Sequence, residues 1–328
     1  MTSPIERLPV EFVEGGDTYV ATVGESPVWH VEEAALYWVD IPARTILRVD
    51  PATGVRHRWT VPEQIGCIAP AGPGRLIAGL ESGIFEIEFD ISAPAPVVGH
   101  TIARRVAAPD FARPGMRFND GRCDRQGRFW AGTMVQDMAA AIPAGGLYRY
   151  DAANGLRGPF VDGLVVQNGL AWSPDGRTMY LSDSHASRRA IWAFDYDIDD
   201  GCPTRKRLFA DLHDHAGRPD GAAVDEDGGY WICANDAGLL LRFTPGGQLD
   251  RRIALPFAKP AMCAFGGPAL DTLFVTSIRL PGCTPDAPDG RLLALCPGVR
   301  GLPEPRFDHP GAVRRTVSSP TFTEKEQS

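Results

Sequence analysis

One short apolar segment recurs six times along the chain. Its copies are YWVD at 37–40, LIAG at 76–79, FWAG at 129–132, YLSD at 180–183, YWIC at 230–233 and LFVT at 273–276. Successive copies begin between 39 and 53 residues apart. Recurrence at such a period is typical of propellers, solenoids and other arrays, in which each repeat is one supersecondary unit.

Each copy is flanked by two further segments that have the character of strands. The segments upstream of it are SPVWH, GCIAP, GRCDR, GLAWS, GAAVD and MCAFG. They are joined to it by turn residues such as Pro174-Asp175-Gly176. The segments downstream alternate apolar with polar residues, as in TILRVD at 45–50 and AIWAFDYD at 190–197, which is the pattern of a half-buried strand. Each repeat therefore predicts several antiparallel strands joined by hairpins.

Six such repeats predict an all-β fold, a six-bladed β-propeller with four-stranded blades around a central channel. A solenoid would need shorter repeats and capping units, and two domains would need a linker, which we do not find inside 20–300. We expect one propeller domain over 1–315 and a polar C-terminal tail over 316–328. An N-terminal strand, at 10–13 or at 19–23, is expected to close the ring by pairing with the last blade.

Composition and charge exclude several classes of protein. The chain of 328 residues is 44% hydrophobic and 23% charged, with a formal net charge of −8, which is ordinary for a soluble globular protein. Basic residues cluster only in pairs and triplets such as 205–207, so a nucleic-acid partner is not expected. Seven cysteines without a C-x-x-C pair favour free thiols. The N-terminus has no apolar core of a signal peptide, and no stretch reaches the length of a membrane span; we expect a cytoplasmic protein that needs no membrane and no obligate protein partner.

Polar residues stand just before the innermost predicted strand in four of the six repeats. They are Glu25, Asn119 (followed by Asp120), Asn168 and Asp220, each beside or near a Gly or Ser. Asn or Asp before Gly is often only a turn, but the shared position in four repeats argues against that interpretation. The four side chains are therefore expected to face one axis at the same height. Two carboxylates and two amide oxygens suit a hard or borderline divalent cation, which would also relieve the repulsion between the carboxylates.

Five motifs, in order, resemble the SMP-30/gluconolactonase/regucalcin-like family. They are GESPVW at 24–29, RFNDGRCDRQGRFWAGTM at 117–134, NGLAWSPDGRTMYLSDS at 168–184, PDGAAVDEDGGYWIC at 219–233 and GVRGLPEPRF at 298–307. The resemblance covers roughly residues 20 to 307. It implies the same six-bladed propeller, one divalent metal ion and a small-molecule sugar lactone as substrate. Because the ligands are all oxygens, Ca²⁺ is favoured, with Zn²⁺, Mg²⁺, Mn²⁺ and Fe²⁺ as alternatives.

The resemblance also assigns roles to particular residues. It implies that Glu25, Asn168 and Asp220 hold the metal and that Asp220 is also the catalytic acid/base. It implies that Arg117 and Asn119 contact the substrate. It also implies a further acidic substrate contact after the G-T-M motif, where this chain has Asp137 and some relatives have Glu. His185 is a weaker candidate for a substrate contact.

These residues suit the hydrolysis of a cyclic ester. A divalent ion can polarise a carbonyl and acidify water, Asp220 could move the proton, and Arg117 and Asn119 could fix orientation. G-x-S-x-G, H-E-x-x-H and P-loop motifs are absent from the sequence. We therefore expect a metal-dependent hydrolase that opens a sugar lactone to its aldonic acid. The alternatives are a phosphotriesterase-like hydrolase on the same scaffold and a non-catalytic calcium-binding propeller.

Overall fold

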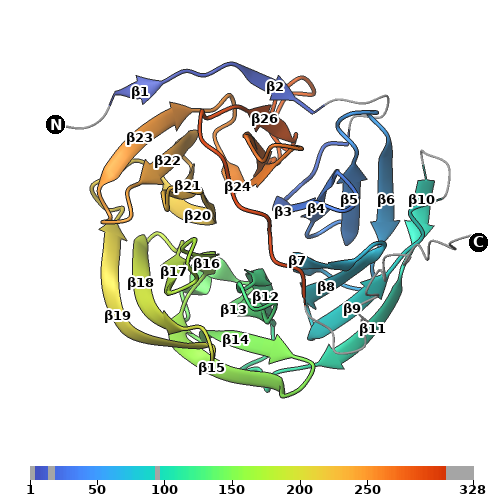
Figure 1. Cartoon of the computed structure of the whole chain (residues 1–328), viewed down its shortest axis with the longest axis vertical. Coiled ribbons are helices and arrows are strands. Elements are labelled where there is room, and N and C mark those ends of the chain that lie inside the picture. The colour runs from blue at the N-terminus through green and yellow to red at the C-terminus, as the bar shows by residue number, and fades with distance from the viewer. Residues whose placement is uncertain (1–3, 14–18, 93–96, 308–328) are drawn as a thin grey trace, which may run out of the picture.

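Six β-sheets stand around one axis in the computed structural model, which describes residues 4–13, 19–92 and 97–307 (Figure 1). Four strands in each sheet run outwards from the axis as an antiparallel blade. The predicted all-β propeller with six four-stranded blades is therefore confirmed. Within the described ranges the single helical element is a 3₁₀ turn, η1 (Met138–Ala140). The tail predicted over 316–328 lies outside the described residues.

The strands follow the repeats that the sequence predicts. The innermost strands are β3 (Gly24–His30), β7 (Ile65–Gly72), β12 (Met116–Cys123), β16 (Gln167–Trp172), β20 (Arg218–Val224) and β24 (Pro260–Gly266). The second strands are β4 (Ala35–Asp40), β8 (Arg75–Leu80), β13 (Phe129–Val135), β17 (Thr178–Asp183), β21 (Tyr230–Asn235) and β25 (Thr272–Ser277). The third strands are β5 (Thr45–Val49), β9 (Ile84–Glu88), β14 (Gly145–Asp151), β18 (Ala190–Asp197), β22 (Leu239–Phe243) and β26 (Leu293–Leu295). The outer strands are β6 (Arg56–Thr60), β11 (Ile102–Ala107), β15 (Gly155–Leu164), β19 (Cys202–Asp211), β23 (Leu249–Ala254) and β2 (Val10–Phe12).

The ring is closed by the N-terminal strand, as expected. β2 pairs antiparallel with β26, with Val10 opposite Leu295 and Phe12 opposite Leu293 (Figure 1). Of the two segments that were predicted to do this, 10–13 is confirmed. The other, 19–23, contributes an isolated bridge between Val23 and Ile278. Because the last blade takes its outer strand from the beginning of the chain, backbone hydrogen bonds join the two ends of the ring.

Two blades carry a fifth strand at the rim. β10 (Val97–His100) lies parallel to β6, and β1 (Ile5–Glu6) lies parallel to β23. Both cover backbone groups that an outer strand would otherwise leave unpaired.

Buried indole groups tie the hairpins to the packing between blades. Trp130 and Trp231 are fully buried in β13 and β21. Each donates its indole N–H to the aspartate at the end of the preceding strand, Asp124 at 3.2 Å and Asp225 at 2.8 Å. The same aspartates accept backbone N–H groups of the hairpin that follows. A D-x-x-G turn in the sequence therefore fixes both the hairpin and the polar partner of a core tryptophan.

All seven cysteines are free, as expected, and four of them are buried. In the ranges that the structure describes, no helix is long and apolar enough to cross a membrane.

Candidate functional site at the channel mouth

A β-bulge interrupts every innermost strand at about the same height. The ladders to the second strands skip between Glu25 and Val28, Ile65 and Cys67, Phe118 and Gly121, Asn168 and Ala171, Pro219 and Ala222, and Pro260 and Cys263. A bulge re-aims the side chains beside it. The four predicted polar positions all fall at these bulges, although they are equivalent only to within one residue. Glu25 and Asn168 are the last paired residues before the bulge, whereas Asn119 and Asp220 lie within it.

The pKa values of the two predicted carboxylate ligands are both raised. Burial, followed by the negative charges of Asp220 and Asp120, raises the pKa of Glu25 well above its ordinary value. Burial also raises the pKa of Asp220 to about 7, against the opposing effects of Arg218 and of a hydrogen bond from Asn235. Glu25 belongs to the first blade and Asp220 to the fifth. Because the charge of Asp220 raises the pKa of Glu25, the two carboxylates share one electrostatic environment although they come from different blades.

Asn168 offers the oxygen that a third ligand would need. Its Nδ2 donates to Ser184 Oγ at 3.1 Å, and its side chain is almost completely buried. Because the amide nitrogen is used in this way, the carbonyl oxygen is left for another partner. In the described part of the chain, no three Asp, Glu, His or Cys side chains gather as a metal site. A cation would therefore depend on the Asn168 amide together with Glu25 and Asp220, a set of oxygens that suits a hard divalent ion.

Arg117 and Asn119 hold each other beside Glu25. Arg117 Nη1 donates to Asn119 Oδ1 and to the Phe118 carbonyl, both at 2.8 Å. Asn119 Nδ2 donates to the Gln167 carbonyl at 2.8 Å, which links the third blade to the fourth. Burial lowers the pKa of Arg117 to about 10, although the charge of Glu25 opposes that shift. Asn119 thus uses both ends of its amide, and the guanidinium of Arg117 is fixed at the site.

The two remaining candidates lie on loops of the same mouth. Asp137 precedes η1, is exposed, and makes no capping hydrogen bond to that turn. His185 follows β17, where its Nδ1 lies 2.8 Å from Ser187 Oγ and accepts the Ser187 N–H at 3.2 Å. Among the described residues neither side chain makes a hydrogen bond or ion pair with Arg117, so their roles toward a substrate stay predictions.

A polar network that sequence reasoning missed lies next to Asp137. Gln136 Oε1 accepts from Gln64 at 3.0 Å, and Gln136 Nε2 donates to Glu81 at 3.2 Å. The charge of Glu81 also acts on the pKa of Arg117. Gln64 could have been predicted from its position in the repeat. It directly precedes the innermost strand of the second blade, as the predicted polar residues of four other blades do in the sequence. Gln136 and Glu81 follow second strands, where the repeat pattern gives no such signal.

Asp120 is a second residue that the sequence left unassigned. Its side chain is 4% exposed, and its Oδ2 accepts the Leu170 N–H at 2.8 Å. Its Oδ1 is buried without a hydrogen-bond partner among the described residues. Burial raises the pKa of Asp120, and the charge of Arg122 opposes this. Asp120 adds a third acidic group beside Glu25 and Asp220, and its charge raises the pKa of both, so a bound cation would relieve more repulsion.

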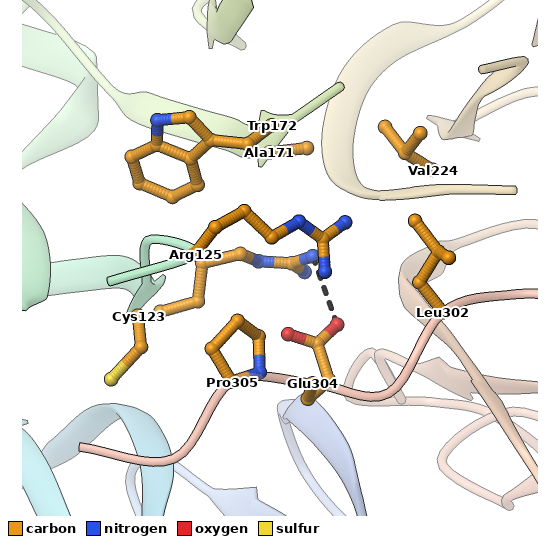
Figure 2. A pocket seen from close by; sticks show the side chains of 9 residues that line it. Cys123, Arg125, Ala171, Trp172, Val224, Leu302, Glu304 and Pro305 are labelled. Atoms are coloured by element: carbon orange, nitrogen blue, oxygen red, sulfur yellow. Dashed lines mark hydrogen bonds and ion pairs between the residues drawn. The ribbon is translucent and has the colours of Figure 1, made fainter. Parts of the chain in front are cut away.

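The C-terminal segment closes the opposite end of the channel. The ribbon of this segment runs across the middle of the ring in Figure 1. Glu304 accepts from Arg122 Nη1 at 3.2 Å, and Pro303 accepts from Arg125 at 3.3 Å. Figure 2 shows Glu304 and Pro305 against Arg125 and Trp172 at a small pocket. A substrate is therefore expected to enter from the mouth where the bulges lie.

These carboxyl groups make stability depend on pH when no metal is bound. A carboxyl whose pKa is higher in the folded than in the unfolded chain stabilises the fold at low pH, and that contribution is lost as pH rises through the folded value. We expect the metal-free protein to lose thermal stability as pH rises from the ordinary Asp range towards and past 7, the value for Asp220. Thermal unfolding in chelator across that range measures this. The slope should be smaller for Asp220→Asn and smaller with Ca²⁺ added; equal slopes in all three samples would contradict the prediction.

Comparisons with a family model and with the sequences of known proteins point to the same group of proteins. The family described as "SMP-30/Gluconolactonase/LRE-like region" matches residues 23–279. The 6-deoxy-6-sulfogluconolactonase of Pseudomonas putida is 37% identical over 291 residues, covering 88% of this chain and 95% of that protein. The regucalcin of Xenopus laevis is 32% identical, covering 78% of this chain and 83% of that protein.

Solved structures agree on the fold. A calcium-binding protein, regucalcin, from Agrobacterium tumefaciens superposes with a TM-score of 0.82 at 23% identity. The superposition covers 94% of this chain and all of that one. At this level of identity the likeness bears on the architecture alone.

Proposed function

The chain belongs to the SMP-30/gluconolactonase/LRE-like family and is a lactonase, and from this premise we propose that it opens a sugar lactone with the help of one divalent metal ion. The product is the aldonic acid. The observation that carries the metal-dependent part is the position of two carboxylates, Glu25 and Asp220, at the bulges of innermost strands from different blades, where the charge of Asp220 raises the pKa of Glu25. Such a pair is stabilised by a cation, and the oxygen of Asn168 supplies a third ligand of the same kind.

The chain's own residues account for the rest of the reaction. When bound, a divalent ion supplies Lewis-acid polarisation of the carbonyl and a more acidic water. Asp220 accepts a proton from the attacking water while the water oxygen forms a bond to the lactone carbonyl carbon. The ring C–O bond breaks, and Asp220 returns the proton to the leaving alkoxide oxygen. Arg117 donates hydrogen bonds that orient the substrate, and Asn119 keeps the guanidinium in place.

Sugar lactones are favoured over plain ones because the mouth is polar. Arg117 and the predicted contact Asp137 provide donors and acceptors that vicinal hydroxyl groups can pair with, and the hydrogen-bonded Gln136 network adds polar groups beside them. A polar group left unpaired on substrate binding costs about 1–3 kcal/mol. The name of the Pseudomonas putida relative points to a gluconolactone with a sulfo group at carbon 6. We therefore include both neutral and sulfonated aldonolactones in the proposed substrate class.

A lactone panel tests this proposal. We expect kcat/KM for five- and six-carbon aldonolactones to exceed that for an unsubstituted lactone of equal ring size by about tenfold or more, since each satisfied hydrogen bond contributes about 1 kcal/mol. Ring opening releases acid, so a pH indicator follows it with metal present. If the unsubstituted ring or an aryl phosphotriester reacts as well, the phosphotriesterase-like alternative is preferred. If metal binds and no lactone or ester reacts, the non-catalytic calcium-binding alternative is preferred.

A further inference from the structure

One buried amide outside the predicted site contacts the proposed acid/base directly. Asn235 is the last residue of β21, beside the bulge that carries Asp220, and its side chain is 1% exposed. Its Nδ2 donates to Asp220 Oδ2 at 2.6 Å. Neither the repeat pattern nor the family motifs single out this residue, because the YWIC copy ends at Cys233.

The direction of this amide is fixed by the groups at its other end. Asn235 Oδ1 accepts from Arg218 Nη2 at 3.4 Å and from Lys259 Nζ at 3.5 Å. Arginine and lysine side chains have donors only. The carbonyl end must therefore face the two cations, and the NH₂ end must face Asp220. A flipped amide would place donors against cations and an oxygen against a carboxylate.

The two cations are themselves held in place. Arg218 Nε pairs with Asp236 Oδ2 at 2.6 Å, and Lys259 pairs with the other oxygen of Asp236. Arg218 Nη1 also donates to the Ser184 carbonyl at 3.1 Å, in the loop after β17. Lys259 comes from the segment before β24, so three blades support one amide. Such a support is more rigid than a single side chain on a loop.

We propose that Asn235 is a positioning residue of the reaction, which holds the Asp220 carboxylate in one orientation by occupying its Oδ2. The other oxygen, Oδ1, has no hydrogen bond to the described residues and is left for the metal and the reacting water. The inference rests on the proposed function for the role of Asp220. Misplacing a reacting group by about 1 Å can cost about 10²-fold in rate, so the effect of losing this donor is expected on kcat more than on KM.

Two substitutions distinguish positioning from packing. Asn235→Asp keeps the shape of the side chain and can still pair with Arg218 and Lys259, but it presents a like charge to Asp220. Asn235→Ala removes the donor, leaves a small cavity and adds no charge. A positioning role predicts that kcat falls by about 10²-fold in Asn235→Asp and by about tenfold in Asn235→Ala. A packing role predicts the reverse order, since the isosteric Asp fills the site better.

Matched controls come from Asn154. This exposed residue lies in the turn between β14 and β15, where, among the residues that the structure describes, its amide bonds to Asp151 alone, at 2.7 Å. Asn154→Asp and Asn154→Ala make the same chemical changes away from the channel, and kcat should stay within about threefold of the wild type. Thermal unfolding of all four variants reports folding.

A second measurement does not depend on activity. The measurement is an NMR spectrum of the ¹⁵N-labelled protein. The side-chain NH₂ signal of Asn235 is assigned as the one that disappears in Asn235→Ala. Its proton shift should move upfield in Asp220→Asn, because a hydrogen bond to a carboxylate is stronger than one to an amide. An unmoved signal, or a folded Asn235→Asp variant with wild-type kcat, overturns the inference. A wild-type protein that hydrolyses no lactone, with the NMR shift still present, would instead count against the proposed function alone.

Discussion

Asp220→Asn should lower kcat for lactone opening by about 10³-fold or more, the upper part of the range for loss of a general acid/base. The amide keeps the size of the side chain and can still accept from Asn235, which donates to Oδ2 of the native residue. It cannot take a proton from water, and it removes one of the charges that a metal would neutralise. Both losses act on the same step. Steady-state kinetics at saturating metal measure the effect.

The control for this variant is Asp214→Asn. Asp214 lies on the exposed loop before β20 and loses the same charge on substitution. Its kcat should stay close to that of the wild type. If Asp220→Asn is folded by circular dichroism and retains more than about a tenth of wild-type kcat, Asp220 is not the acid/base.

Removal of the metal should be the other large effect. We expect a chelator to reduce lactone hydrolysis by at least about 10²-fold, because several kcal/mol of charge stabilisation in the transition state is lost. Activity should return when Ca²⁺, Mg²⁺, Mn²⁺ or Zn²⁺ is added in excess, and the order of the returned rates identifies the preferred ion. Inductively coupled plasma analysis confirms that the treated protein is free of metal.

The same samples test the ligands. An ion at about 100 times its dissociation constant stabilises the fold by about 2.7 kcal/mol, which thermal unfolding detects. Glu25→Gln should weaken this stabilisation, whereas Glu32→Gln, on the exposed turn after β3, should not. Full activity in the metal-free protein would refute the metal-dependent part of the proposal.

The sequence determined the fold because the relevant signals are local. Apolar alternation, the YWVD-like segments and the D-x-x-G turns each specify one hairpin, and six copies of a hairpin unit can bury their faces only by packing side by side. Ring closure could also be predicted from the sequence, because a strand at 10–13 has no partner in its own repeat. Between two N-terminal candidates the choice needed the structure, because both segments have the same pattern.

The site could be predicted only in part from the sequence. Glu25, Asn168 and Asp220 stand out because they break the repeat at one height, and the structure places them at the bulges of their strands. Their assumed equivalence was too simple, since a bulge adds a residue at a place that the sequence does not mark. The repeat pattern places Asn119 at the same position as the predicted ligands. In the structure its Oδ1 accepts from Arg117 and its Nδ2 donates to the Gln167 carbonyl.

Tertiary structure alone decided the supporting residues. Asn235 meets Asp220 across a strand pair, and its orientation depends on Lys259, which belongs to a different blade. The Gln64, Gln136 and Glu81 network joins the second blade to the third. Such contacts link residues that are far apart in the sequence, and their geometry depends on strand register and on the distance between blades. Periodicity along the chain fixes which face of a strand a residue occupies, but it carries no information about which side chain of the next blade will stand opposite.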